Sequence, residues 1–357
     1  MKDEIEKIEV PANYKKKTPY ITITQYAYPD ETAIFLQFIS EWRDSSSFSE
    51  IAKNLLTLCI INSLEICSYT IKSGQYLGWD YRSPKIIKAN EKRVEKGRKL
   101  LPKKVVRKHI GEIRNTILEE LSHVINDIKI IQNSDIHSAD VKVNYVQNSV
   151  LMELPKMNAD SINGVITSPP YCNRYDYTRT YALELAYLGI DDRGIKKMRQ
   201  DLLSCTVENK SKLDKLGEYY KEIGCFDRFK EIKRVIENND VFNEIMEALN
   251  TRKAHGDLNN NGVIRMINGY FTELAFIYAE LYRICKKGSK VIFVNDNVRY
   301  GGEVIPVDFL SSLFAEQFGF KIDKIYCLKQ QKGNSSQQMA KYGRVPLRKS
   351  LTVWEKI

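Results

Sequence analysis

One short stretch organises this chain, Val165-Ile166-Thr167-Ser168-Pro169-Pro170-Tyr171. The apolar run that leads into it, Ile162 to Ile166, predicts a buried β-strand. Two consecutive prolines end that strand, because neither has an N–H for a sheet ladder or a helix. A polar turn directly after a strand is typical of the edge of an open α/β sheet where ligands bind.

The groups in this turn suit a planar base that carries an exocyclic amino group. The Ser168 hydroxyl and the Pro169 carbonyl can accept hydrogen bonds, and the Tyr171 ring offers a stacking surface. The alternative is purely structural, namely a Pro-Pro turn that closes a strand and binds nothing. The residues that follow the turn favour the binding site.

Residues 167–171, together with the continuation Asn173-Arg174-Tyr175-Asp176-Tyr177-Thr178-Arg179-Thr180-Tyr181-Ala182-Leu183-Glu184-Leu185, resemble the catalytic region of a known family. That family is the S-adenosylmethionine-dependent DNA amino-methyltransferases of restriction-modification systems. The resemblance covers about residues 141–180 and 264–357, and more faintly 50–85. The Ser-Pro-Pro-Tyr form is most similar to the cytosine-N4 branch, with adenine N6 as the other target.

The resemblance implies a site and a mechanism. The catalytic residues would be Ser168, Pro169, Pro170 and Tyr171, acting on a base flipped out of the duplex. No metal is required, and Cys172 would be a packing residue. S-adenosylmethionine would be the cofactor, with contacts implied from Asn148, Thr167 and Asp296, and the turn residues Asn173, Arg174 and Tyr175 would contact DNA.

Charge supports a nucleic-acid partner. The chain has a net charge of +10, and eleven Lys/Arg against two Glu lie between Lys85 and Lys108. Such a segment can hold a phosphate backbone without reading sequence, although it can also be an ordinary solvated helix face. The candidate DNA contacts are Lys103, Lys104 and Arg107 in this segment, Tyr76, Trp79 and Arg82 in the aromatic-rich loop before it, and Lys332 and Arg344 in a polar loop near the C-terminus.

Cysteine usage indicates the cellular compartment. The seven cysteines are odd in number and never form a Cys-x-x-Cys pair, which argues against disulfides and zinc. We therefore expect a cytoplasmic protein without a signal peptide or a membrane span.

The fold class expected is α/β, an incomplete Rossmann-like methyltransferase sheet whose C-terminal strands are antiparallel. Residues 1–140 are expected to form an N-terminal, mainly helical, basic region, and residues 141–190 and 263–357 the catalytic half. Residues 191–262 are expected to form a helical insertion. The insertion is a target-recognition element, a lid or a purely structural element. Within these regions we expect an N-terminal arm over residues 1–19. Strands are expected at 20–24, 141–146, 162–166, 291–294, 321–328 and 351–354. Helices are expected over 33–67 with a break at 45–49, in the segment after Pro102, over 181–188, in the segment that ends at 286–288, and over 306–318. The polar side chains of Asn295, Asp296 and Asn297 are expected to face the same crevice as Ser168.

One expected feature is missing. The family carries a glycine-rich turn that holds the cofactor, but this sequence contains no Gly-x-Gly. Without the strands around that turn, the sheet exposes unpaired edges. We therefore expect a partner protein that supplies the turn. The alternatives are a catalytically degenerate DNA-binding or specificity protein, a sheet partly rebuilt by residues 20–28, and an RNA amino-methyltransferase.

Overall fold

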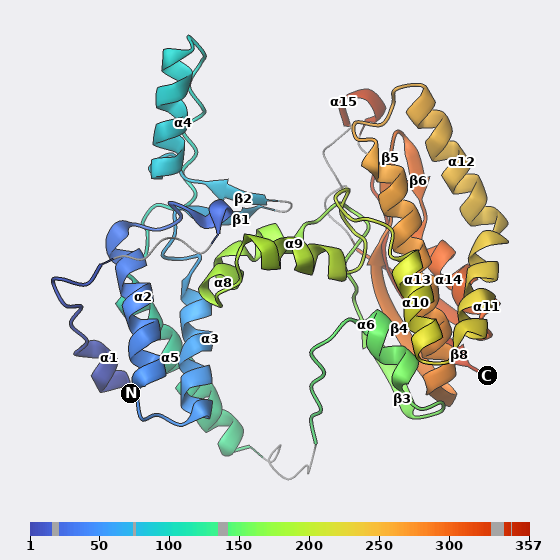
Figure 1. Ribbon diagram of the computed structural model, residues 1–357, viewed down its shortest axis with the longest axis horizontal. Coiled ribbons are helices and arrows are strands. Elements are labelled where there is room, and N and C mark those ends of the chain that lie inside the picture. Colours follow the sequence, from blue (N-terminus) through green and yellow to red (C-terminus); the bar gives the residue numbers. More distant parts are fainter. Residues whose placement is uncertain (16–20, 74–75, 135–141, 330–338, 344) are drawn as a thin grey trace. The chain divides into compact units, whose positions relative to one another are not determined.

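A computed structural model describes residues 1–15, 21–73, 76–134, 142–329, 339–343 and 345–357 (Figure 1). The chain divides into two compact units. The first comprises residues 1–145 and 177–198, and the second comprises residues 146–176 and 199–357. Within the described residues, no helix combines the length and the apolar character needed to cross a lipid bilayer.

The first unit is built mainly from helices. Helices α2 (Asp30–Ser45), α3 (Glu50–Ser63) and α5 (Ile113–Gln132) surround a core that includes Ile39, Leu56 and Ile117. The Ser-rich break between α2 and α3 is confirmed, because Ser49 caps α3 by accepting the Ala52 N–H at 3.3 Å. The later part of the chain adds α7 (Tyr177–Thr180), α8 (Ala182–Tyr187) and the start of α9 (Asp192–Asp201).

Two expectations about this unit are wrong, and a third is confirmed with a later start. The N-terminus is not an arm, because α1 (Lys2–Glu6) buries Ile5 in the helical core. Thr22–Thr24 forms a 3₁₀ turn rather than a strand, since the Thr22 N–H and hydroxyl bond the Asp192 carboxylate instead of a neighbouring strand. The helix expected after Pro102 is α5, but it begins only at Ile113, where the Glu112 side chain caps it.

A hairpin and a helix complete the first unit. Strands β1 (Thr70–Ser73) and β2 (Tyr76–Trp79) pair antiparallel within the aromatic-rich segment. Helix α4 (Pro84–Glu95) follows, with Ser83 as its N-cap, and it stands out from the rest of the unit (Figure 1).

The second unit contains a four-stranded mixed sheet in the order β3-β4-β8-β7. Strand β3 (Ile162–Thr167) lies parallel to β4 (Cys285–Asp296), while β8 (Lys349–Lys356) is antiparallel to both β4 and β7 (Phe320–Leu328). The expected antiparallel pairing of the C-terminal strands is therefore confirmed. A separate hairpin joins β5 (Val298–Tyr300) to β6 (Glu303–Ile305).

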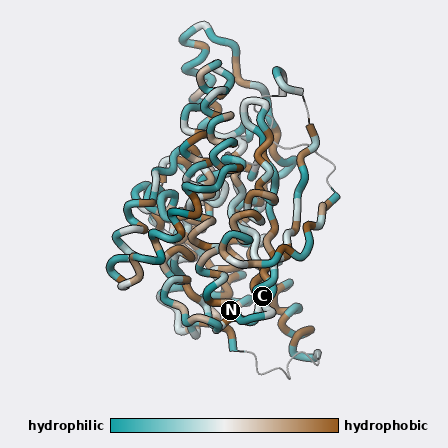
Figure 2. Tube along the Cα trace, turned by 90° about the vertical axis from the view of Figure 1, so that its right-hand side faces the viewer, coloured by the Kyte–Doolittle hydropathy of each residue, from teal (hydrophilic) through white to brown (hydrophobic). Residues whose placement is uncertain are grey.

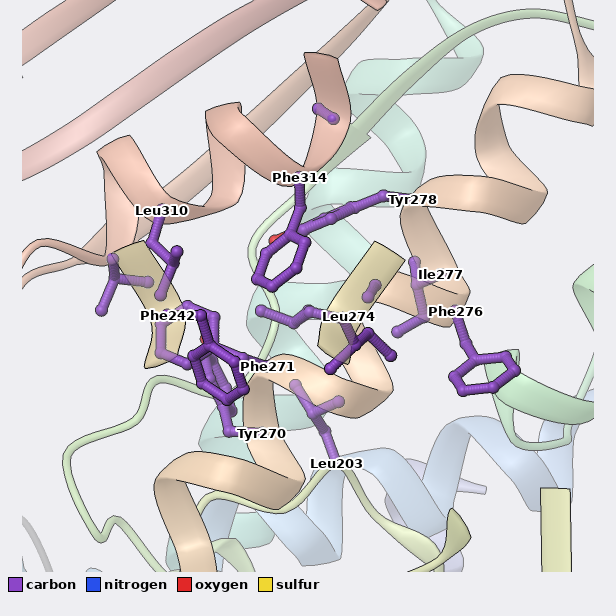
Figure 3. Packing of buried hydrophobic residues seen from close by; sticks show 14 of the residues in the cluster. Leu203, Phe242, Tyr270, Phe271, Leu274, Phe276, Ile277, Tyr278, Leu310 and Phe314 are labelled. Atoms are coloured by element: carbon purple, nitrogen blue, oxygen red, sulfur yellow. The ribbon is translucent and has the colours of Figure 1, made fainter. Parts of the chain in front are cut away.

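Helices cover this sheet and make a large core. The central helix α13 (Gly262–Ile284) and α14 (Val307–Gln317) pack with α10 (Leu213–Glu222), α11 (Phe226–Glu237) and α12 (Asp240–Ala254). The rings of Phe242, Phe271 and Phe314 meet in this core, with centroids 5.8 and 5.9 Å from Phe242 (Figure 3). Hydrophobic residues recur among hydrophilic ones along the helices, as amphipathic packing requires (Figure 2). Three short helices remain: α6 (Val150–Glu153), a 3₁₀ turn over Leu154–Lys156, and α15 (Met339–Tyr342).

Two sequence predictions are wrong, one about this unit and one about residues 141–146, which span the boundary between the two units. The helix expected to end at 286–288 ends at Ile284, and Gly288 (φ +80°) lies inside β4, where the pairing with β3 is irregular. Residues 142–147 form no strand, although their apolar side chains alternate; Tyr145 is 85% exposed. A strand needs a neighbour, and the described chain provides none there.

Candidate active site

The Ser-Pro-Pro-Tyr turn lies at the carboxyl end of the parallel strand pair. Strand β3 ends at Thr167, whose register partner in β4 is Phe293, and residues 168–171 follow at once. Ser168 is exposed and Tyr171 is half-buried, so the turn is open to a ligand. The Ser168 Oγ and Tyr171 OH atoms lie 3.0 Å apart and share a hydrogen bond. The turn thus presents a hydroxyl pair and an aromatic ring together.

The floor of the turn is rigid and apolar. Cys172 is fully buried, and its carbonyl accepts a hydrogen bond of 2.8 Å from the buried Tyr300 hydroxyl. Burial raises the pKa of the Cys172 thiol well above its usual range, so the sulfur stays protonated and weakly nucleophilic. The interpretation of Cys172 as a packing residue is confirmed by this burial.

The next residues form a tight turn. Arg174 adopts a left-handed conformation (φ +66°), which is uncommon for a residue with a side chain. The Asn173 side chain accepts the Tyr175 N–H at 3.1 Å, and an Arg174 guanidinium nitrogen lies 3.3 Å from the Asn259 side-chain oxygen. The three predicted DNA contacts Asn173, Arg174 and Tyr175 are therefore brought together beside the Ser-Pro-Pro-Tyr turn.

A cation that the sequence reading did not single out lies next to Tyr171. The Lys349 ammonium, at the start of β8, is 5.3 Å from the centre of the Tyr171 ring, within cation–π range. Lys349 is 178 positions away from Tyr171 in the chain. Only the sheet register reveals the proximity, because Lys349 pairs with Asp296 at the end of β4.

The polar residues Asn295, Asp296 and Asn297, which end β4 and follow it, are all buried. Asn295 is buried and donates to the Tyr270 hydroxyl at 2.9 Å, while the Asn297 side chain accepts the Asp308 N–H at 3.2 Å. The prediction that Asn295 and Asn297 face the crevice is therefore wrong, since both satisfy buried polar groups. Asp296 is also buried, at the last position of β4.

Among the described residues, those predicted to contact S-adenosylmethionine do not by themselves make a site for it. The Asn148 amide is exposed, donates to the Glu153 carboxylate and accepts the Ser149 N–H at 2.8 Å. Thr167 is half-buried at the end of β3. On its other side β3 has no strand neighbour within the described residues, and Ile166 is 81% exposed there. The expected burial of this strand is wrong, because none of the β3 residues is buried.

The arginines proposed for DNA contact in the first unit are used as structural donors. The Arg82 guanidinium bonds the buried Asp80 carboxylate at 2.8 and 3.0 Å, and Arg107 donates to the Ser68 carbonyl at 3.1 Å and to the Glu65 carbonyl. Trp79 is half-buried beneath the Lys85 ammonium, 4.0 Å from its ring centre.

Two of the remaining candidates for DNA contact are exposed, and the side chains of the other three lie outside the described residues. Lys103 and Lys104 are exposed. Tyr76 opens β2, but its side chain, like Lys332 and Arg344, lies outside the described residues. No group of three His, Cys, Asp or Glu side chains in the described part of the chain is placed to hold a metal ion.

Comparison with known proteins adds the family. No protein-family model matches the chain. The Type II methyltransferase M.BsoBI of Geobacillus stearothermophilus is 51% identical over 346 residues, which are 97% of this chain and 68% of that protein. The Type II methyltransferases M.AvaI of Nostoc sp. (strain PCC 7120) and of Anabaena variabilis are each 39% identical over 348 residues, 96% of this chain and 67% of those proteins. These relatives are therefore longer than the region they share with this chain.

Proposed function

Because the chain belongs to the Type II methyltransferases, we propose that it methylates the exocyclic amine of a base flipped out of DNA. Cytosine N4 is the favoured target and adenine N6 the alternative. The observation that carries this proposal is the exposed Ser168–Tyr171 hydroxyl pair at the carboxyl end of β3. Ligands bind at this edge in open α/β sheets.

The chain's own residues would hold the base. The Ser168 hydroxyl and the Pro169 carbonyl accept hydrogen bonds from the amine, and the Tyr171 ring stacks on the flipped base. Catalysis is then mainly positioning, which contributes about 7–11 kcal/mol in well-oriented reactions. No covalent bond to the protein is needed, in keeping with the protonated Cys172 thiol.

The methyl donor would be S-adenosylmethionine, and we propose that a partner polypeptide completes its binding site. Two observations support this part. The sequence has no Gly-x-Gly turn, and no strand in the described part of the chain pairs with the second side of β3, whose Ile166 side chain is exposed. A system of this kind would protect DNA in the cytoplasm as part of restriction-modification.

Methyl-transfer assays with labelled S-adenosylmethionine test the proposal. The full chain is assayed on duplex DNA and on hairpin RNA, alone and with the part of M.BsoBI that lies outside the match added as a second polypeptide. We expect transfer to duplex DNA only in the mixture. Ser168→Ala and Tyr171→Ala should each reduce the rate about 10²–10³-fold, the typical effect of removing one group that stabilises the transition state.

Matched variants separate chemistry from folding. Tyr171→Phe keeps the ring and should retain more activity than Tyr171→Ala, while Ser47→Ala, an exposed serine in the first unit, should match the unaltered chain. Transfer that Ser168→Ala does not slow would contradict the proposed site. Transfer by the chain alone would keep the chemistry and contradict the partner, and transfer to RNA alone would contradict the DNA substrate.

A further inference from the structure

A projecting hairpin of the first unit contributes no buried residue to a core. It consists of α4 and the return segment 96–105, and residues 84–105 are called the basic arm below. Helix α4 has no buried residue. A surface helix ordinarily buries an apolar stripe against a core. Packing therefore does not explain why this helix stands out from the unit (Figure 1).

The basic arm is nevertheless internally ordered. The Arg93 carbonyl accepts the Arg98 N–H at 2.8 Å, and the Arg93 side chain donates to the Lys99 carbonyl at 2.6 Å. In addition, the Leu101 N–H of the return segment donates to the Asn90 side chain of α4 at 2.9 Å. These bonds tie the return segment to the helix, so the backbone that carries the charges is ordered before any ligand binds. Such preorganisation lowers the entropic cost of binding.

The surface of the basic arm is strongly cationic. Its exposed basic residues are Lys88, Lys92, Lys96, Arg98, Lys99, Lys103 and Lys104, against the acidic residues Glu91 and Glu95. Within the described residues, Lys92, Lys96 and Lys99 form no ion pair with a carboxylate. The arm contains no aromatic residue, so it has no ring with which to stack on unpaired bases.

We propose that the basic arm lies along the phosphate backbone of duplex DNA and supplies sequence-independent affinity. This rests on the proposed function, which makes DNA the substrate. A rigid cationic arm without aromatics matches a polyanionic backbone by charge, whereas base recognition requires contacts to base edges. Each lysine that neutralises a phosphate releases counterions, which makes binding depend on salt.

The test compares two triple variants of the full chain that remove the same charge. Lys92, Lys96 and Lys99 are changed to Gln on the arm, and Lys286, Lys287 and Lys321, exposed lysines of the second unit, are changed to Gln as the control. Fluorescence anisotropy with a labelled duplex gives the Kd over about 50–200 mM salt. The arm variant should bind about 10–100-fold more weakly at low salt, with a log K against log salt slope shallower by about 2–3.

Duplexes of other sequences and hairpin RNA test whether the binding is independent of sequence and requires DNA. The loss should be equal for duplexes of unrelated sequence; a loss confined to one sequence would mean that the arm reads bases, and the proposal would be overturned. An unchanged slope, an equal loss in the control, or a loss seen with hairpin RNA but not with DNA would also overturn it. Methyl transfer by the unaltered mixture is measured separately. Its absence would contradict the proposed function, whereas equal Kd values for the arm and control variants would contradict only the role of the basic arm.

Discussion

Lys349 places a positive charge beside the ring proposed to stack on the target base. Its ammonium lies 5.3 Å from the centre of the Tyr171 ring, and it makes no ion pair with a carboxylate within the described residues. A cation beside a flipped nucleotide can bind a phosphate that flanks it. We therefore expect Lys349→Gln to weaken duplex binding several-fold and to make the salt slope shallower by about 1.

Two further variants give this prediction its control. Lys349→Arg keeps the charge and should restore both the affinity and the salt slope. Lys287→Gln, on the exposed amino-terminal part of β4, should change neither quantity. If Lys349→Gln and Lys287→Gln were indistinguishable in anisotropy titrations, a phosphate contact at Lys349 would be ruled out.

At the residue scale, features that depend on neighbouring residues in the sequence could be predicted, whereas features that depend on tertiary contacts could not. The Ser168–Tyr171 pair could be predicted because its chemistry lies within four consecutive residues. Lys349 could not, since its place beside Tyr171 depends on the pairing of β8 with β4. The intramolecular contacts of two arginines could not be predicted for a related reason. Arg82 and Arg107 resemble phosphate ligands in the sequence, but buried carbonyl and carboxylate groups in their own unit use their donors.

At the scale of elements, the basic arm depends on one buried carboxylate at its root. Asp80 is fully buried and accepts hydrogen bonds from the Arg82 guanidinium and from the Val106 N–H, the latter at 2.9 Å. These hydrogen bonds, that of Arg82 foremost, lower the pKa of Asp80 from 3.8 to about 2. The charged form therefore stabilises the fold at neutral pH. This contribution is complete above the unfolded pKa and is lost as the pH falls through the folded value.

We expect Asp80→Asn to destabilise the chain by about 1.5–3 kcal/mol at pH 7, the range for a hydrogen bond to a charged group. The variant should also lose the part of the acid dependence that falls between about pH 4 and pH 2. Urea denaturation at several pH values measures both effects, and hydrogen exchange at Val106 reports the arm root. Asp127→Asn, an exposed change on α5, is the control. Equal stability of the two variants would contradict the role assigned to Asp80.

Elements whose signals are local could be predicted, whereas those that depend on a neighbour could not. The break between α2 and α3 and the helix α14 follow from caps and periodicity. The end of α13 was misplaced because Lys286-Lys287-Gly288 has the composition of a helix end, but Gly288 serves an irregular part of β4. Residues 142–146 alternate like a strand, yet a strand forms only against a partner ladder.

For the molecule as a whole, the side of β3 away from β4 is a candidate assembly surface, because no strand among the described residues pairs with it. Sheet edges that carry exposed apolar residues are templates for pairing with another segment. Here the edge strand leads directly into the Ser-Pro-Pro-Tyr turn, and Ile166 near its end is exposed. The relatives contain sequence beyond the shared region. A strand from such a segment, paired to β3, would complete the sheet beside the proposed site.

A charge on this edge tests that assembly. Ile166→Lys should leave the stability of the isolated chain within about 0.5 kcal/mol, because the side chain is 81% exposed and little packing is lost. In the mixture with the unmatched part of M.BsoBI, the same variant should lose co-purification and methyl transfer, since an ammonium would be buried where the added segment also covers this face of β3. Ile51→Lys is the matched control, as Ile51 on α3 is 83% exposed and lies in the first unit. If Ile166→Lys still co-purified and transferred methyl groups like Ile51→Lys, the completing strand would have to pair elsewhere, and the free edge of β3 would be only a solvated one.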